Sequence, residues 1–436
     1  MLRKRIQIGL VHVALTITLL PINSALNRVM IKELALSAAL VALLASLPYL
    51  FSPIQVAIGS FSDRRPLFGL RRTPYILIGL IFCVIGVIVS PYIAFLLAEN
   101  LALGIALGLL AFGAWGMGFN FATVAYFSLA TELSGEKQRG RTIAVMFTMM
   151  IISIILTSAG LSELLDPYTE EALISSFRLI GIIGLALGLI GIIGLEQRGA
   201  PLPATTEKRF SWNEMYRAVM ENRQAILFFR YLILMLIAIL GQDILLEPFG
   251  AEAFGLSVRE TTRITSIWGT FFLITLVLGG ALENRVNKVT QARIGAWSGI
   301  AAFALIIAGG LNANLGLFYV GVIALGLATG LATVSNLSLM LDMTTAGKVG
   351  LFMGVWGMAT AVSRLSGNLI GGVLRDTLTA LMDNAVGAYS VVFGIEMLIL
   401  MLSLWLLRAI DVSSFQEKAT ASMDYVERAA LAGGDS

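Results

Sequence analysis

The sequence predicts an all-α polytopic membrane protein with twelve transmembrane helices in two pseudo-symmetric six-helix halves. Three observations predict this fold class: an apolar composition, a series of apolar runs of membrane-spanning length, and a polar loop motif that occurs twice. Of the 436 residues, 57% are hydrophobic and only 13% are charged, and the mean hydropathy is +0.87. A soluble domain carries about 25% charged residues, so most of the surface of this chain must face lipid.

The apolar runs divide the chain into twelve spans, because a transmembrane helix needs about 20 apolar residues. The first six spans have cores near residues 6–28, 36–60, 73–97, 101–130, 142–163 and 174–195. The second six have cores near residues 225–247, 262–282, 291–311, 315–340, 350–374 and 387–408. We therefore expect a first half (1–196), a linker (197–223), a second half (224–410) and a polar tail (411–436).

The linker carries a pattern typical of a short surface helix. Ser211 and Glu214 have the spacing of a capping box, and one helical face then holds Trp212, Met215, Tyr216 and Val219. An apolar face of this kind predicts an amphipathic helix that lies on the cytoplasmic membrane surface. The alternative is a plain linker with a chance pattern.

The loops on one side of the predicted bundle hold most of the 30 Lys and Arg residues, and both termini lie on that side. Positive residues are retained in the cytoplasm, so this bias predicts a multi-pass protein with both termini cytoplasmic. Arg28 and Lys32 break the trend, because they follow the first span on the opposite side. Glu33 or an acidic partner could neutralise them.

The polar loop after the second span has a counterpart after the eighth. Gly59, Asp63, Arg64 and Arg72 have the same spacing as Gly280, Asn284, Arg285 and Arg293, and Arg71 precedes Arg72. A carboxylate among guanidinium groups can join two helix bundles, and breaking the contact would let the halves rock. We predict that these nine residues form a cytoplasmic latch. The alternative is that the arginines only fix the topology.

Two charged residues, Arg364 and Glu396, lie inside the last two spans. Counted from the non-cytoplasmic ends of an antiparallel hairpin, both lie at a depth of about 15 Å. The sequence therefore predicts that they pair. Intramembrane charges are costly and mark functional sites, although the pair could also be only structural.

A polar cluster is predicted at the outer ends of the first and seventh spans, formed by Asn27, Arg28, Gln242, Asp243 and Glu247. Asp243 and Glu247 are four residues apart, which places them on one helix face. Pro248 is expected to end that helix. Two like charges at this spacing need a cation, for which Arg259, Arg263 or a bound polypeptide is available.

Several phrases of the sequence resemble one family of membrane proteins. The Gly59–Arg64 motif is similar to the signature of the major facilitator superfamily. A narrower resemblance, to the PucC/LhaA or bacteriochlorophyll delivery family, is carried by Asn27–Met30, Asp63–Gly69, Arg71–Tyr75, Gln242–Gly250 and Phe352–Gly357. It extends from about Asn27 to Glu396.

This resemblance implies an assembly factor for light-harvesting complexes that delivers or inserts chlorophyll or bacteriochlorophyll into antenna polypeptides. It also implies a bacterial inner membrane, either cytoplasmic or photosynthetic. Antenna polypeptides are the implied partners, together with pigment-synthesis enzymes. His12 and Asp243 are candidate ligands for the magnesium of a pigment cargo, although a lone histidine is more often a packing residue.

The sequence also excludes several classes of site. A single cysteine (Cys83) and a single histidine (His12) exclude a disulfide and a Cys-rich or multi-His metal site. We find no nucleotide-binding loop and expect neither enzymatic activity nor a nucleic-acid partner. Two other functions stay open. One is a proton-coupled secondary transporter of a small solute, with Glu396 and Asp243 as the candidate acids. The other is a pigment-free docking scaffold for antenna helices.

Overall fold

The computed structural model describes residues 2–55, 58, 61–62, 65–134, 138–196, 198, 216–217, 219–220, 222–281, 285–342 and 349–411. Within these residues, ten helices are long and apolar enough to cross a membrane. Two further segments occupy the remaining predicted spans. They are the long helix α15 (Val349–Met382) and an interrupted helix made of α2 (Ala38–Ala45), α3 (Leu47–Leu50) and η3 (Ser52–Ile54). The predicted all-helical membrane fold is confirmed.

The first half contains α1 (Leu2–Pro21), α5 (Thr73–Glu99), α6 (Leu101–Ser134), α7 (Arg139–Leu164) and α8 (Glu170–Ile192) in addition to α2 and α3. Two π-helical turns, η1 (Ile22–Leu26) and η2 (Val29–Glu33), extend α1. Helix α1 packs against α7 and α8, and α5 packs against α6 and α8. Small residues allow close packing: a Cβ atom on Gly79 would lie 2.4 Å from the carbonyl oxygen of Gly118.

The second half begins with α10 (Arg223–Leu240), the 3-10 turn η5 (Gly241–Ile244) and α11 (Leu246–Phe254). It continues with α12 (Val258–Ala281), α13 (Lys288–Leu311), α14 (Leu315–Asp342), α15 and α16 (Ala385–Leu407). Helix α13 packs against α14 and α16, and α10 packs against α15 and α16.

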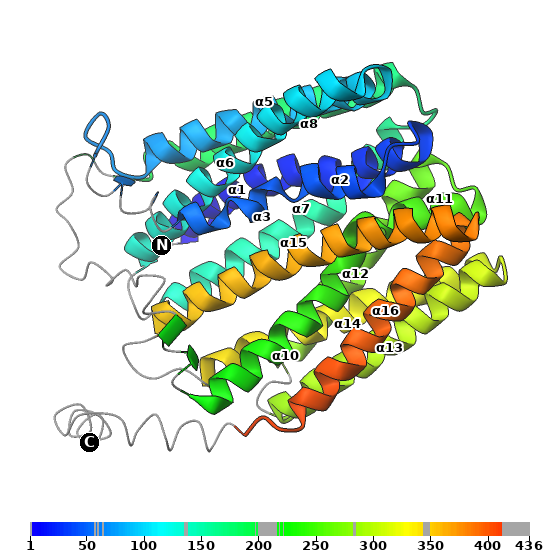
Figure 1. Cartoon of the computed structure of the whole chain (residues 1–436). Coiled ribbons are helices and arrows are strands. Elements are labelled where there is room, and N and C mark those ends of the chain that lie inside the picture. Colours follow the sequence, from blue (N-terminus) through cyan, green and yellow to red (C-terminus); the bar gives the residue numbers. More distant parts are fainter. Residues whose placement is uncertain are drawn as a thin grey trace.

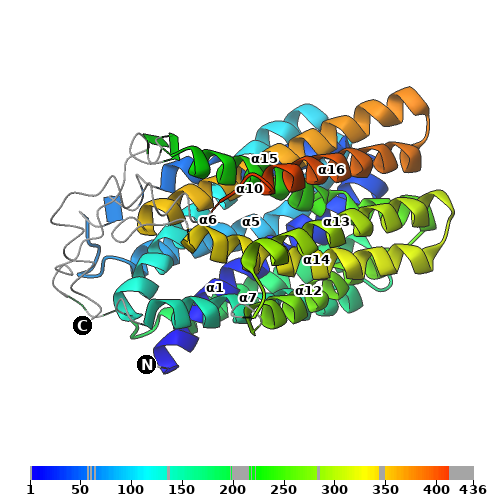
Figure 2. The same ribbon diagram turned by 90° about the horizontal axis from the view of Figure 1, so that it is seen from below.

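Figure 1 shows the two halves as separate groups of helices that meet along two helix pairs, α7 with α12 and α2 with α15. In the view of Figure 2 the long helices run in roughly one direction, with turns at both ends of the bundle. We call the end at which α1 begins the near side, and the end at which η2 finishes the far side.

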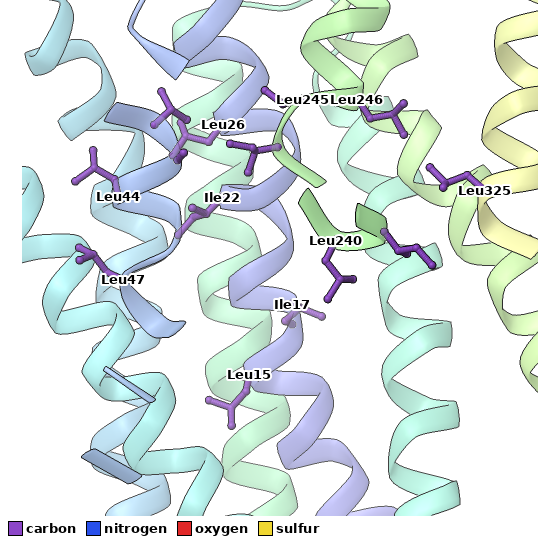
Figure 3. Packing of buried hydrophobic residues seen from close by; sticks show 14 of the residues in the cluster. Leu15, Ile17, Ile22, Leu26, Leu44, Leu47, Leu240, Leu245, Leu246 and Leu325 are labelled. Atoms are coloured by element: carbon purple, nitrogen blue, oxygen red, sulfur yellow. The ribbon is translucent and has the colours of Figure 1, made fainter. Parts of the chain in front are cut away.

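The first helix of each half is interrupted near the far side. Pro21 precedes the π-helical turn η1, and α10 ends at Leu240 before the turn η5. The two interruptions are in contact. Apolar side chains from both gather between the ribbons in Figure 3, where Ile22 and Leu26 come from η1, and Leu240, Leu245 and Leu246 from the second interruption.

The prediction that the seventh span is one continuous helix is wrong. A continuous helix was expected to reach residue 247 and to end at Pro248, but the helix breaks earlier and Pro248 lies in the first turn of α11. A proline is tolerated there because the first N–H groups of a helix have no intrahelical partner. The break means that Asp243 and Glu247 do not share one continuous helix.

The predicted amphipathic helix of the linker lies largely outside the described residues, which include only Tyr216 and Val219 of its apolar face. The predicted tail is outside them from residue 412 onward.

Candidate functional site

Glu247, at the start of α11, joins the two halves near the far side. Its side chain is buried, and its Oε1 atom accepts hydrogen bonds from the hydroxyl groups of Ser24 in η1 and Thr265 in α12, the latter at 2.6 Å. Arg28 is close enough for an electrostatic interaction. Ser24 lies in the π-helical turn η1, and such turns are frequent at functional sites.

Asp243 and Arg364 form an ion pair where the halves meet. Asp243 Oδ2 accepts a hydrogen bond from Arg364 Nη1 at 2.7 Å, and Oδ1 accepts one from Gln242 at 3.1 Å. The guanidinium carbon of Arg364 lies 5.6 Å from the ring centroid of Tyr49 in α3 of the first half. Such a cation–π contact adds to the attraction between the halves.

The structure differs here from the prediction that Arg364 pairs with Glu396. Depth along a span fixes the height of a side chain but not the direction in which it points. Arg364 points toward Asp243 in the interruption after α10, whereas the Glu396 carboxylate of α16 lies beside Gly241 of the same segment.

Glu396 is only 5% exposed and packs against two glycines. Its Oε1 atom is 2.8 Å from the position that a Cβ atom on Gly241 would take. The Cα atom of Gly367 is 3.3 Å from the same position. Its Oε2 atom has no hydrogen-bond partner in the described part of the chain. Because an ionised carboxylate buried without a cation is costly, Glu396 is a candidate proton-binding group.

Asp376 of α15 caps a helix of the other half. Its carboxylate accepts hydrogen bonds from the backbone N–H groups of Ala38 at 3.1 Å and Ala39 at 2.9 Å, and from the Ser37 hydroxyl at 2.7 Å. A carboxylate is stabilised at a helix N-terminus by these unpaired N–H groups. Nearby, a Cβ atom on Gly372 would lie only 2.7 Å from the carbonyl oxygen of Ala38, so α15 and α2 touch through their backbones.

Further contacts join the halves on the far side. Arg259 of α12 pairs with Glu163, at 2.7 Å, and with Asp166, both in the first half.

The end of the first helix also contacts the second half. Arg28 pairs with Glu33 of its own half and donates to the carbonyl oxygen of Leu256 in the second half at 3.0 Å. Lys32 pairs with Glu252 at 2.7 Å. Together with the hydrogen bonds of Asp376, these contacts link the two halves on the far side.

His12 of α1 is enclosed by aromatic rings in the first half. The ring centroids of Tyr126 and Phe147 both lie 5.3 Å from the imidazole, and that of Phe127 lies 5.9 Å away. The Nδ1 atom is buried and has no hydrogen-bond partner among the described residues.

The family described as "PUCC protein" matches residues 25–415 of the chain. This chain belongs to the PUCC protein family. The "Protein PucC" of Cereibacter sphaeroides is 29% identical over 398 residues, which cover 88% of this chain and 85% of that protein. The "Bacteriochlorophyll synthase 44.5 kDa chain" of Rhodobacter capsulatus is 27% identical over 411 residues, which cover 90% and 92%.

Solved structures confirm the predicted major facilitator fold of this PUCC protein. The structure of a D-xylose–proton symporter superimposes with a TM-score of 0.72, covering 94% of this chain and 98% of the symporter. The two sequences are only 14% identical, so the similarity concerns the fold alone.

The predicted latch of this PUCC protein is described only in part. Gly59, Asp63, Arg64 and Asn284 lie outside the described residues. Arg72 is buried and donates to Glu132 at the end of α6, at 2.8 and 3.0 Å. The Glu196 carboxylate accepts hydrogen bonds from the backbone N–H groups of Arg71, Arg72 and Thr73. These contacts tie the start of α5 to α6 and to the end of α8 within the first half.

The described residues of the second copy of the motif, after α12, are more exposed than Arg72 of the first copy. The side chains of Arg285 and Arg293 are exposed, and a Cβ atom on Gly280 would meet nothing within 4 Å. The latch between halves stays a prediction, whereas the contacts of Arg72 indicate a role in holding the first half together.

Replacing Arg72 by glutamine is expected to destabilise the PUCC protein much more than Arg293→Gln. Arg72→Gln removes the charged hydrogen bonds of a buried guanidinium group to the partly exposed Glu132 carboxylate, at a cost of about 1.5–3 kcal/mol. An exposed substitution changes stability by about 0.5 kcal/mol or less. Thermal unfolding of the detergent-solubilised variants measures the difference. Equal stabilities of the two variants would contradict a structural role for Arg72.

Proposed function

We propose that this chain is a membrane assembly factor for light-harvesting complexes, which delivers or inserts chlorophyll or bacteriochlorophyll into antenna polypeptides. The observation that carries the proposal is the similarity, over nearly the whole chain, to proteins named PucC and "Bacteriochlorophyll synthase 44.5 kDa chain". The pigment is cargo in this proposal, and the chain itself is not an enzyme. Its partners are antenna polypeptides and the enzymes that supply the pigment.

The interior of the protein supports a cargo of this kind. The magnesium of a chlorophyll accepts a lone pair from an axial ligand, and a neutral imidazole is a suitable donor. His12 offers an imidazole inside an aromatic enclosure. Asp243 is less suited, because both of its carboxylate oxygens already accept hydrogen bonds and its pairing with Arg364 would have to break.

The side from which the pigment enters can be inferred from the distribution of positive charge and from the contacts that join the halves on the far side. The near-side loops carry most of the Lys and Arg residues, and we infer that this side and both termini face the cytoplasm. Since the halves are joined on the far side, the cargo would enter from the cytoplasm or from the bilayer. Closure of the far side and rocking of the halves are typical of this type of fold.

The absorption spectrum of the protein, purified gently from a pigment-producing host, tests the proposal. We expect chlorophyll bands in stoichiometric amount, and loss of antenna complexes with intact pigment synthesis when the gene is deleted. A purified protein that carries no pigment would refute delivery by direct binding. If antenna complexes are still lost in that case, the docking scaffold becomes the better function.

One observation favours a second candidate, a proton-coupled secondary transporter. Glu396 is buried, and one of its oxygens has no hydrogen-bond partner in the described part of the chain. Asp243 is close enough to interact with it electrostatically. Concentrative uptake of a solute into vesicles, driven by a proton gradient and abolished by Glu396→Gln, would support this candidate.

A further inference from the structure

An arginine on the outer surface of the first half has no carboxylate partner in the described part of the chain. Arg178 is exposed on α8, and its Nη2 atom donates a hydrogen bond to the hydroxyl group of Tyr92 on α5 at 3.2 Å. These two helices pack together at the outer edge of the first half (Figure 1). Arg259 and Arg364, by contrast, pair with carboxylates of this chain. The charge of Arg178 is therefore available to a partner outside the chain.

Both residues of this pair lie at membrane depth, nearer the far side. Arg178 is about 12 Å along the helix axis from Glu170, where α8 begins. Tyr92 is about 10 Å from Glu99, where α5 ends. With 23 residues, α8 is about 34 Å long, and a hydrocarbon layer about 30 Å thick covers all but about 2 Å at each end. The backbone of Arg178 thus lies about 10 Å below the far-side edge of the hydrocarbon.

The hydrogen bond to Tyr92 holds the guanidinium group at this depth. A long arginine side chain in a membrane normally extends toward the headgroups, but this one is bound to a phenol whose backbone lies at a similar depth. The Tyr92 oxygen accepts this bond, so its own proton can be donated to another group. The pair can therefore present N–H and O–H donors to one anion.

Apolar side chains surround this pair on both helices. Ile85 of α5 is 52% exposed, and Ile182 and Ile190 of α8 are 57% and 54% exposed. Gly181 allows the two helices to touch, because a Cβ atom there would lie 2.7 Å from Ile88 Cγ1. We use the name α5–α8 surface for the exposed side chains of Tyr92, Ile85, Arg178, Ile182 and Ile190.

We propose that the α5–α8 surface binds a transmembrane helix that carries a carboxylate at the depth of Arg178, with the Arg178 guanidinium and the Tyr92 hydroxyl as donors to that carboxylate. The inference rests on the proposed function in one respect, that the helix belongs to an antenna polypeptide. A carboxylate inside a membrane is costly unless it is paired, and an arginine can bind it through two parallel hydrogen bonds. The phosphate of a phospholipid stays at headgroup level, above this pair, whereas a helix can present a carboxylate at any depth.

Binding of a synthetic peptide to the full-length protein in phosphatidylcholine vesicles tests the surface. The peptide is a helix of about 20 apolar residues with one glutamate about 10 Å from one end, and a matched peptide has glutamine in its place. Energy transfer measures binding, with the acceptor on a cysteine at Asn100, which is exposed after α5, while the native Cys83 is buried. The glutamate peptide should bind about five-fold or more tightly than the glutamine peptide. In Arg178→Leu this preference should disappear.

Matched variants separate the charge from other effects of substitution. Arg178→Lys keeps the charge without the paired hydrogen bonds and should retain part of the preference. Tyr92→Phe keeps the ring, removes the hydroxyl donor and should also lower the preference in part. Arg263 is another exposed arginine near the far side, on α12, and Arg263→Leu should leave the preference unchanged.

The outcomes separate this surface from the proposed function. Equal affinities of the wild-type protein for the two peptides would overturn the surface and leave pigment delivery standing. Loss of the preference when phosphatidylglycerol replaces half of the phosphatidylcholine would also overturn it, because Arg178 would then hold a lipid phosphate. A wild-type protein that carries no pigment in a pigment-producing host would refute delivery by direct binding and leave the peptide result unaffected.

Photocrosslinking in the antenna-producing host tests the identity of the helix. A photoreactive amino acid at Ile182 should form a crosslink to an antenna polypeptide in the otherwise unchanged protein, and the crosslink should be lost when Arg178→Leu is added. Crosslinks to lipid alone would overturn the antenna polypeptide as the partner.

Discussion

Replacing Arg364 by methionine is expected to reduce sharply the amount of folded protein in the membrane. Arg364 pairs with Asp243 at 2.7 Å and lies against Tyr49 of the other half. Without the guanidinium group, the half-buried Asp243 carboxylate loses its cation and a charged hydrogen bond, at a cost of about 1.5–3 kcal/mol. This is a substantial part of the about 5–15 kcal/mol that stabilises a typical protein. The yield of monodisperse protein after mild solubilisation, and its thermal stability, measure the loss.

A second substitution identifies the true partner of Arg364. Adding Asp243→Asn to Arg364→Met removes the stranded charge and should restore most of the stability, since replacing both members of a buried pair is often nearly neutral. Adding Glu396→Gln instead should restore little. If Glu396→Gln were the substitution that rescues, the pairing predicted from depth alone would be correct and the observed geometry would be contradicted.

Adding a single methyl group at Gly372 is expected to open the far side. A Cβ atom there would lie 2.7 Å from the backbone carbonyl oxygen of Ala38, which cannot move without shifting the start of α2. Overpacking of this kind costs about 1–3 kcal/mol, equivalent to a population shift of about five-fold to about a hundred-fold. Gly372→Ala should therefore weaken the Asp376 cap and favour a state in which the halves separate.

Distances between spin labels on the far side measure this opening. Asn100 in the first half and Asn312 in the second are exposed there and can be replaced by cysteine. The native Cys83 is buried and should not react with the label. Gly394→Ala is the matched control, because a Cβ atom on Gly394 would meet nothing within 4 Å. An unchanged distance distribution in Gly372→Ala would show that this contact does not hold the far side closed.

The order and type of the helices could be predicted because a span leaves a local signal, its run of apolar residues. The predicted core at 315–340 corresponds to α14, and the core at 387–408 to α16, with small differences at the ends. The interruption after Leu240 could not be predicted in the same way. Its polar residues, Gln242 and Asp243, are of types that also occur inside continuous helices, and the contact of the break with η1 of the other half leaves no signal in the local sequence.

The candidate site could be predicted less completely, because partners distant in the sequence decide it. Arg28, Asp243 and Glu247 were predicted to belong to one polar cluster at the outer ends of the first and seventh spans, but their partners were not all identified. Ser24 and Thr265, which hydrogen-bond to Glu247, are unremarkable in an apolar span. Asp376 was missed because it lies just beyond the predicted span 350–374 and its role depends on the start of α2 lying beside α15. Glu196, which binds the backbone before α5, was missed for the same reason.

The π-helical turn η1 also bears on how this chain and its relatives diverged. Such a turn holds one residue more than an α-helical turn, so it is equivalent in geometry to an α-helix with a single inserted residue. Removing that residue would rotate the part of α1 before the turn relative to the part after it, by about 100° for a helix of 3.6 residues per turn. Relatives with a one-residue deletion at Ile22–Leu26 should therefore present another side chain where Ser24 now contacts Glu247.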